Sequence, residues 1–170
     1  IIMNKSKSLF KFMAFTLSLF SFSTFSGTET YTQHSSSIPV STAVEISPPA
    51  SVIYFSGRLP KVTNTNEIKE LRDKFGGNTK EQALSVLTDL KKSLQLIGLD
   101  TKNIVKVQVF LVGDERLNNR MDIEGFSEAY NQFFSTKKND KVPVRTLVQV
   151  AGLAQDGMLV EIEITAVRAG

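Results

Sequence analysis

Two short segments near the end of the chain hold residues that could do chemistry together. Pro143-Val144-Arg145-Thr146 places an arginine at the start of one expected strand, and Val160-Glu161-Ile162-Glu163 places two carboxylates on the next. The proline biases the backbone where the chain enters the first strand. If the two strands form a hairpin, the guanidinium can bind an anion through paired hydrogen bonds while a carboxylate handles a water or a proton.

Each of these residues also has a plainer interpretation. Arg145 can be a surface arginine paired with a nearby acid. Glu161 and Glu163 are two residues apart, so they project from the same face of their strand and can be a solvated polar face. Taken one by one, the plainer interpretations are favoured, and residue types alone do not choose between them.

The composition excludes several other kinds of site. The 170 residues include no cysteine and a single histidine, His34, which lies in a polar stretch rich in serine and threonine. Thiol nucleophiles, cysteine metal sites, zinc centres and Ser-His-Asp triads are thereby excluded. We therefore expect neither a metal nor another cofactor.

Residues 1–26 are typical of a secretory signal peptide. Lysines follow Met3, residues 12–25 are apolar or small without an acidic residue, and Thr24 and Ser26 suit cleavage after Ser26. The apolar run is shorter than the ~20 residues of a membrane-spanning helix, so we favour export, to the periplasm, over a permanent membrane anchor. Cleavage removes three lysines and leaves 17 basic and 17 acidic residues. Without net charge or a basic stripe, the mature chain is not expected to bind nucleic acid.

Hydrophobic periodicity predicts one α+β domain over residues 39–170, after a disordered leader at residues 27–38. Strands are expected at 40–46, 52–55, 104–112, 146–151 and 158–167, and helices at 79–97 and 122–134, with a shorter one at 67–74. Thr79 and Gln82 have capping-box spacing at the start of the first long helix. This order, β-β-α-β-α-β-β, favours a mostly antiparallel sheet with both long helices on one face.

The order of the motifs along the chain resembles the YjgF/RidA family, the enamine/imine deaminases formerly labelled endoribonuclease L-PSP. The resemblance covers roughly residues 39 to 168. The motifs that carry it are Ser56-Gly57-Arg58-Leu59-Pro60, Thr79–Gln82, Val105–Val112, Tyr130–Phe134, Pro143–Thr146 and Val160–Ile164. Two further segments, Gly76-Gly77-Asn78-Thr79-Lys80 and Val112-Gly113-Asp114, are similar to an exported branch of that family.

The resemblance implies a chorismate-mutase-like (YjgF-like) fold and a homotrimer with an active site in each cleft between subunits. The implied reaction is hydrolysis of small 2-imino or 2-enamino acids to a 2-oxo acid and ammonia. Arg145 is implied to grip the substrate carboxylate and Glu161 to handle the water. Ser56 and the backbone of Leu147 are implied to line the cleft.

Three cleft positions depart from the family pattern. Val40 stands where a tyrosine is expected, Arg58 takes the place of a polar residue after Ser-Gly, and Ser127 stands where asparagine is common. We expect these positions to alter which substrate binds. The alternative function is therefore a non-catalytic trimer that binds small carboxylates or partner proteins in the same cleft. The older label also suggests a ribonuclease, which the neutral mature chain argues against.

Overall fold

The computed structural model describes residues 28–32, 40–63, 66, 68–134 and 141–170. The signal peptide expected over residues 1–26 lies outside these residues and stays a prediction, as does export. Within the described ranges, no helix is long and apolar enough to cross a membrane.

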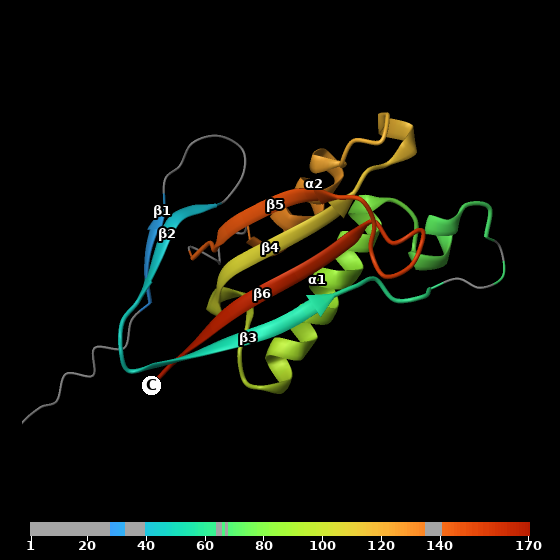
Figure 1. Cartoon of the computed structure of the whole chain (residues 1–170). Helices are drawn as coiled ribbons and strands as arrows, with labels where there is room; N and C mark the ends of the chain where they lie inside the picture. The colour runs from blue at the N-terminus through green and yellow to red at the C-terminus, as the bar shows by residue number, and fades with distance from the viewer. Residues whose placement is uncertain (1–27, 33–39, 64–65, 67, 135–140) are drawn as a thin grey trace, which may run out of the picture.

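A four-stranded sheet with the strand order β3-β6-β4-β5 carries the domain (Figure 1). The β3–β6 and β6–β4 pairs are antiparallel and the β4–β5 pair is parallel. Helices α1 (Thr79–Leu96) and α2 (Ile123–Phe134) lie together on one face of this sheet. The expected α+β fold and mostly antiparallel sheet are confirmed. The four strands are β3 (Ala50–Arg58), β4 (Ile104–Val112), β5 (Val144–Val150) and β6 (Val160–Ala169).

The last two strands do not form the hairpin expected from the sequence. Strand β4 lies between β5 and β6, so β5 and β6 are not neighbours. Strand β5 follows α2 and pairs in parallel with β4, which is the arrangement of a crossover through a helix. The alternating residues identified each strand, but they carry no information on which strand lies beside it.

The core lies between the sheet and the two helices. Apolar residues recur along α1 at steps of three and four. Four of them, Ala83, Leu87, Leu90 and Leu94, are buried, whereas the next, Ile97, is 40% exposed because the helix ends at Leu96. The aromatic residues of α2 share one face and pack in the core, with Phe133 only partly buried. The central residues of this core are Ala83, Leu87, Leu90, Leu94, Val107, Val109, Leu111, Phe126, Tyr130, Phe134, Ile162 and Ile164.

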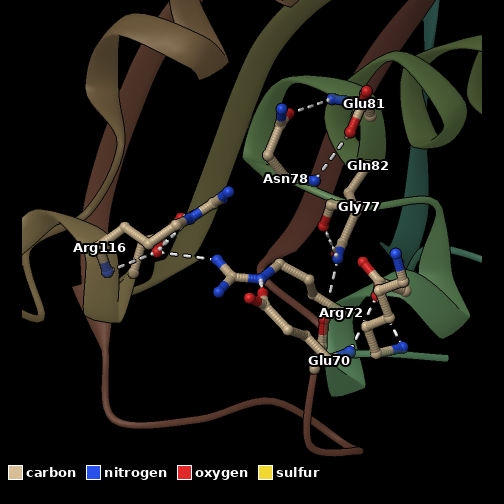
Figure 2. Close-up of polar contacts among 11 residues, drawn as sticks. Glu70, Arg72, Gly77, Asn78, Glu81, Gln82 and Arg116 are labelled. Atoms are coloured by element: carbon tan, nitrogen blue, oxygen red, sulfur yellow. Dashed lines mark hydrogen bonds and ion pairs between the residues drawn. The ribbon is translucent and has the colours of Figure 1, made fainter.

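The capping box of α1 is Asn78 with Glu81, and the predicted pair Thr79 and Gln82 is wrong. The Glu81 backbone N–H donates to Asn78 Oδ1 at 3.1 Å, and the Asn78 N–H donates to Glu81 Oε2 at 2.9 Å. Gln82 is instead fully buried. Its amide donates to the carbonyls of Gly77 and Gly157 and accepts from the Leu159 N–H, which ties α1 to the loop before β6 (Figure 2).

Two short segments differ from expectation. Strand β1 (Thr28–Thr32) pairs antiparallel with β2 (Ser41–Ile46), so the disordered leader expected at 27–38 is wrong for these five residues. Three threonines and a tyrosine give this segment good strand propensity. The short helix expected at 67–74 is a 3₁₀ turn, Leu71–Phe75.

Candidate functional site

Arg145 lies on β5 and faces the helix-covered side of the sheet. It pairs with Val107 of β4, which is fully buried in the core. Its guanidinium carbon is 4.7 Å from the centre of the Tyr130 ring and 5.6 Å from the centre of the Phe126 ring. These cation–π contacts hold the guanidinium against α2.

The guanidinium of Arg145 has an unsatisfied donor. Its Nη1 atom is buried and has no hydrogen-bond partner among the described residues. Burial lowers the pKa of Arg145, yet a guanidinium stays charged at neutral pH. Burial also raises the pKa of Tyr130, so its neutral phenol does not balance this charge. An unpaired buried donor costs ~1–3 kcal/mol or more, and an anion bound at Nη1 removes that cost.

Strand β2 holds the chain just ahead of Arg145. The Ser41 N–H donates to the Pro143 carbonyl at 3.1 Å, and the buried Ser41 hydroxyl donates to the Val142 carbonyl. Val40, the half-buried residue before Ser41, therefore lies near the start of β5. Sequence reasoning singled out Val40 and missed Ser41. The only signal for Ser41 was that it directly follows Val40, the position at which the family resemblance led us to expect a tyrosine.

Glu161 lies on the uncovered face of the sheet, against Gly57. Its neighbours Val160 and Ile162 are fully buried on the helix side, so Glu161 faces the other way. A Cβ added to Gly57 would lie 1.9 Å from Glu161 Oε1. The glycine of the Ser-Gly motif thus leaves the space that the Glu161 carboxylate occupies.

Ser56 lies on the same uncovered face. It lines a pocket of about 300 Å³ together with Lys106, Gln108 and Glu163. The second carboxylate of the Glu161–Glu163 pair therefore lies beside Ser56.

Arg145 and Glu161 do not meet within one chain. Arg145 pairs with Val107 of β4 and Glu161 pairs with Phe110, so the two residues lie at different levels and on opposite faces of the sheet. Three residues of strand span ~10 Å, and two strand-to-strand steps add another ~10 Å across the sheet. A single copy of the chain cannot place both groups on one small substrate.

Most of the predicted site residues accordingly fall into two groups. Leu147 pairs with buried Val109 and shares the face of Arg145, and Ser127 follows Phe126 on α2. We call Arg145, Leu147 and Ser127 the arginine half, and Ser56, Gly57 and Glu161 the glutamate half.

Arg58 joins neither half. It pairs with buried Ile162. Its positive charge helps to lower the pKa of the Asp89 carboxyl on α1, after the larger effect of a hydrogen bond from Lys61. Arg58 therefore lies toward the helix side of β3, away from Glu161.

A larger cleft, of about 590 Å³, lies where β4 and β5 end and β6 begins. Three of its lining residues, Glu70, Arg72 and Asp114, belong to one ion-pair network. Asp114 accepts from Arg72 Nη1 at 2.9 Å and from Arg116 Nη2 at 2.8 Å, and Arg72 also pairs with Glu70 (Figure 2). Hydrogen bonds from Arg116 and then Arg72 hold the pKa of Asp114 well below its usual range, although its burial acts in the opposite direction. This network joins the turn around Arg72 to the end of β4, and its mutual pairing indicates a structural role.

The fold and the two halves define a small α+β protein with a half-buried arginine at one sheet edge and a carboxylate fitted against a Ser-Gly pair. A family model described as Endoribonuclease L-PSP matches residues 32–168, so the chain belongs to this family, the YjgF/RidA family. The resemblance drawn from the sequence motifs is thereby confirmed.

Individual relatives agree with this assignment. A RutC family protein of Saccharolobus solfataricus is 30% identical over 128 residues, which cover 75% of this chain and 86% of the relative. The solved structure of E. coli TdcF with bound serine is 32% identical, with a TM-score of 0.52, and the match covers 69% of this chain and 81% of TdcF. A putative endoribonuclease of Thermotoga maritima is 30% identical, with a TM-score of 0.51 and coverage of 78% and 88%. These similarities support the chorismate-mutase-like fold.

Proposed function

We propose that this protein is a hydrolytic deaminase that converts small 2-imino or 2-enamino acids to a 2-oxo acid and ammonia. The observation that carries the proposal is the buried, unpartnered Nη1 of Arg145, held against Tyr130 and Phe126. A guanidinium fixed in this way is a preorganised donor for a substrate carboxylate. Membership of the YjgF/RidA family is consistent with this small-molecule role.

The proposal assembles each site from two copies of the chain. Arg145 of one copy binds the substrate carboxylate, and Glu161 of a neighbouring copy handles the water. The uncovered face of the sheet offers a surface for this contact, because Val52, Tyr54 and Val148 on it are 41%, 80% and 40% exposed. A homotrimer, which the family resemblance implies, repeats the contact three times and closes the ring.

The chemistry needs only a bound substrate, a water and a proton acceptor. An imine carbon is already electrophilic, so water adds to it while the Glu161 carboxylate takes a proton. The carbinolamine that forms then breaks its C–N bond, the departing nitrogen is protonated, and ammonia leaves behind a 2-oxo acid. Orientation and preorganised charge supply much of the acceleration, and a general base contributes ~10²–10⁴-fold. Ser56 and the backbone of Leu147 complete the cleft in this proposal.

One observation favours a second candidate, a non-catalytic binder of small carboxylates. Position 40 carries an apolar valine, so this wall of the cleft lacks the phenol that the family resemblance led us to expect. TdcF has been solved with bound serine, which is itself a small carboxylate. A binder needs Arg145 but tolerates loss of Glu161.

An assay of 2-oxo acid release separates the two candidates. An amino-acid oxidase generates the imine in situ, and the rate of 2-oxo acid formation is compared with and without the protein. We expect acceleration by the wild-type chain, none by Arg145→Ala and a sharp reduction by Glu161→Gln. No acceleration over buffer for any 2-imino acid would contradict the deaminase proposal and leave the binder.

A further inference from the structure

Gln82 is a buried polar residue of α1 whose amide bonds to the chain just ahead of β6 (Figure 2). Its Nε2 atom donates to the Gly77 carbonyl at 3.0 Å and to the Gly157 carbonyl at 2.9 Å. Its Oε1 atom accepts from the Leu159 N–H at 2.8 Å. Both amide hydrogens are therefore used, and two of the three bonds fix the loop that leads into β6.

These two bonds lie close to Glu161 along the chain. Leu159 is two residues before Glu161, about 7 Å in an extended strand. Gly157 has a φ of +90°, and a Cβ there would lie 2.4 Å from the Leu71 carbonyl oxygen. The bend at Gly157 thus also packs closely against the backbone of Leu71, and the chain enters β6 from a fixed point.

Glu161 needs support ahead of it because β6 has one neighbouring strand at that level. Among the described strands, β3 ends at Arg58, which pairs with Ile162, and its register shifts between Phe55 and Arg58. Glu161 pairs with Phe110 of β4 and lies beyond the last β3 pair. The ladder holds Glu161 from the β4 side, and Gln82 holds the chain that leads into it from α1.

We propose that Gln82 is a positioning residue for Glu161: by fixing where β6 begins, its amide sets the place of the Glu161 carboxylate against Gly57. The proposal rests on the deaminase function above, in which Glu161 handles the water. Without the amide, the Leu159 N–H and the Gly157 carbonyl lose their partners, and the chain before Glu161 relaxes. A shift of about 1 Å at a reacting group can lower a rate by about 10²-fold.

Gln82→Met tests this role, because methionine keeps the length of the side chain and loses its hydrogen bonds. Rates of imine hydrolysis are measured per folded protein, with the folded fraction from circular dichroism. We expect kcat to fall by about tenfold to 10²-fold. KM should change little, because Arg145 on β5 binds the substrate carboxylate. In the Glu161→Gln background, Gln82→Met should lower kcat little further, since the group it displaces is already lost.

Val86→Ala is the matched control. Val86 is a buried core residue one turn along the same helix, so its truncation destabilises the fold by another route. It should leave kcat per folded protein unchanged. Where Gln82→Met does not fold, Gln82→Glu keeps an oxygen for the Leu159 N–H and is measured in the same two backgrounds, with the same expected dependence on Glu161.

An unchanged kcat, or a loss that appears in KM alone, overturns the proposal. So does a double variant whose fold-loss equals the product of the two single losses, since Gln82 would then act on the fold and not through Glu161. If the wild type hydrolyses no imine, the deaminase proposal fails. Crystal structures of wild type and Gln82→Met then test the positioning directly, and a Glu161 carboxylate in the same place against Gly57 in both overturns it.

Discussion

Gly57→Ala should lower catalysis while leaving the fold intact. The added Cβ would lie 1.9 Å from Glu161 Oε1, and ordinary contact begins at 3.4 Å, so the carboxylate must move by about 1.5 Å. Among the described glycines, those with a positive φ are Gly76, Gly77, Gly98 and Gly157. The backbone at Gly57 therefore accepts alanine, and a compatible glycine-to-alanine change typically stabilises by ~0.4–1 kcal/mol through the unfolded chain.

The displacement sets the size of the effect. A misplacement of about 1 Å at a reacting group can lower a rate by about 10²-fold. We therefore expect kcat for imine hydrolysis to fall by about 10²-fold in Gly57→Ala. The free energy of unfolding, from urea titration, should stay within about 1 kcal/mol of wild type. The rate is measured as 2-oxo acid release from an imine generated in situ.

Two comparisons show whether the loss acts through Glu161. Gly152→Ala is the matched control, because a Cβ there meets nothing within 4 Å, and its rate should equal that of wild type. In the Glu161→Gln background, adding Gly57→Ala should lower the rate little further, since the carboxylate it displaces is already lost. A wild-type rate in Gly57→Ala would refute the reasoning. So would a double variant whose fold-loss of rate equals the product of the fold-losses in Gly57→Ala and Glu161→Gln.

Three further predictions concern other parts of the molecule. Arg145→Lys should raise KM at least tenfold because an ammonium lacks the bidentate fork; steady-state kinetics with an unchanged KM would contradict the anion-binding role. Ser41→Ala removes the hydrogen bond from the Ser41 hydroxyl to the Val142 carbonyl, so it should raise KM more than it lowers kcat. Ser41→Thr keeps the hydroxyl and should restore wild-type kinetics. Equal activity of both variants and wild type would show that this hydrogen bond does not position Arg145. Asp114→Asn should lower the free energy of unfolding at pH 7 by about 3 kcal/mol, because it breaks a buried ion pair. The pKa of Asp114 is lowered from 3.8 in the folded chain, so this stabilisation is complete above pH ~4 and is lost as pH falls through the lowered native pKa. Urea titrations from pH 2 to 7 should therefore show a weaker acid dependence in Asp114→Asn, and parallel curves would contradict this.

The sequence predicted the elements of the fold better than their pairing. The alternation in Ile104–Val112 and the apolar stripe of α1 are local patterns, and both elements formed where they were expected. The insertion of β4 between β5 and β6 depends on the crossover through α2, which no local pattern encodes. The capping box was expected one residue too late, because Asn78–Glu81 and Thr79–Gln82 both have capping-box spacing and the sequence does not choose between them.

The candidate site was predictable in its residue types but not in its geometry. Family resemblance selected Arg145 and Glu161, yet only the strand register shows that they face opposite sides of the sheet. The role of Gly57 depends on the packing of Glu161 against it, a contact between residues more than a hundred positions apart.

The most direct test of the two-copy site is a mixing experiment with Arg145→Ala and Glu161→Gln. Each variant alone should be nearly inactive. After subunit exchange in an equal mixture, a site built from two copies has both wild-type groups in about a quarter of cases, by random assembly of the ring. We predict that the mixture regains about a quarter of wild-type imine hydrolysis. A mixture that exchanges subunits and stays as inactive as its components would contradict a site shared between copies.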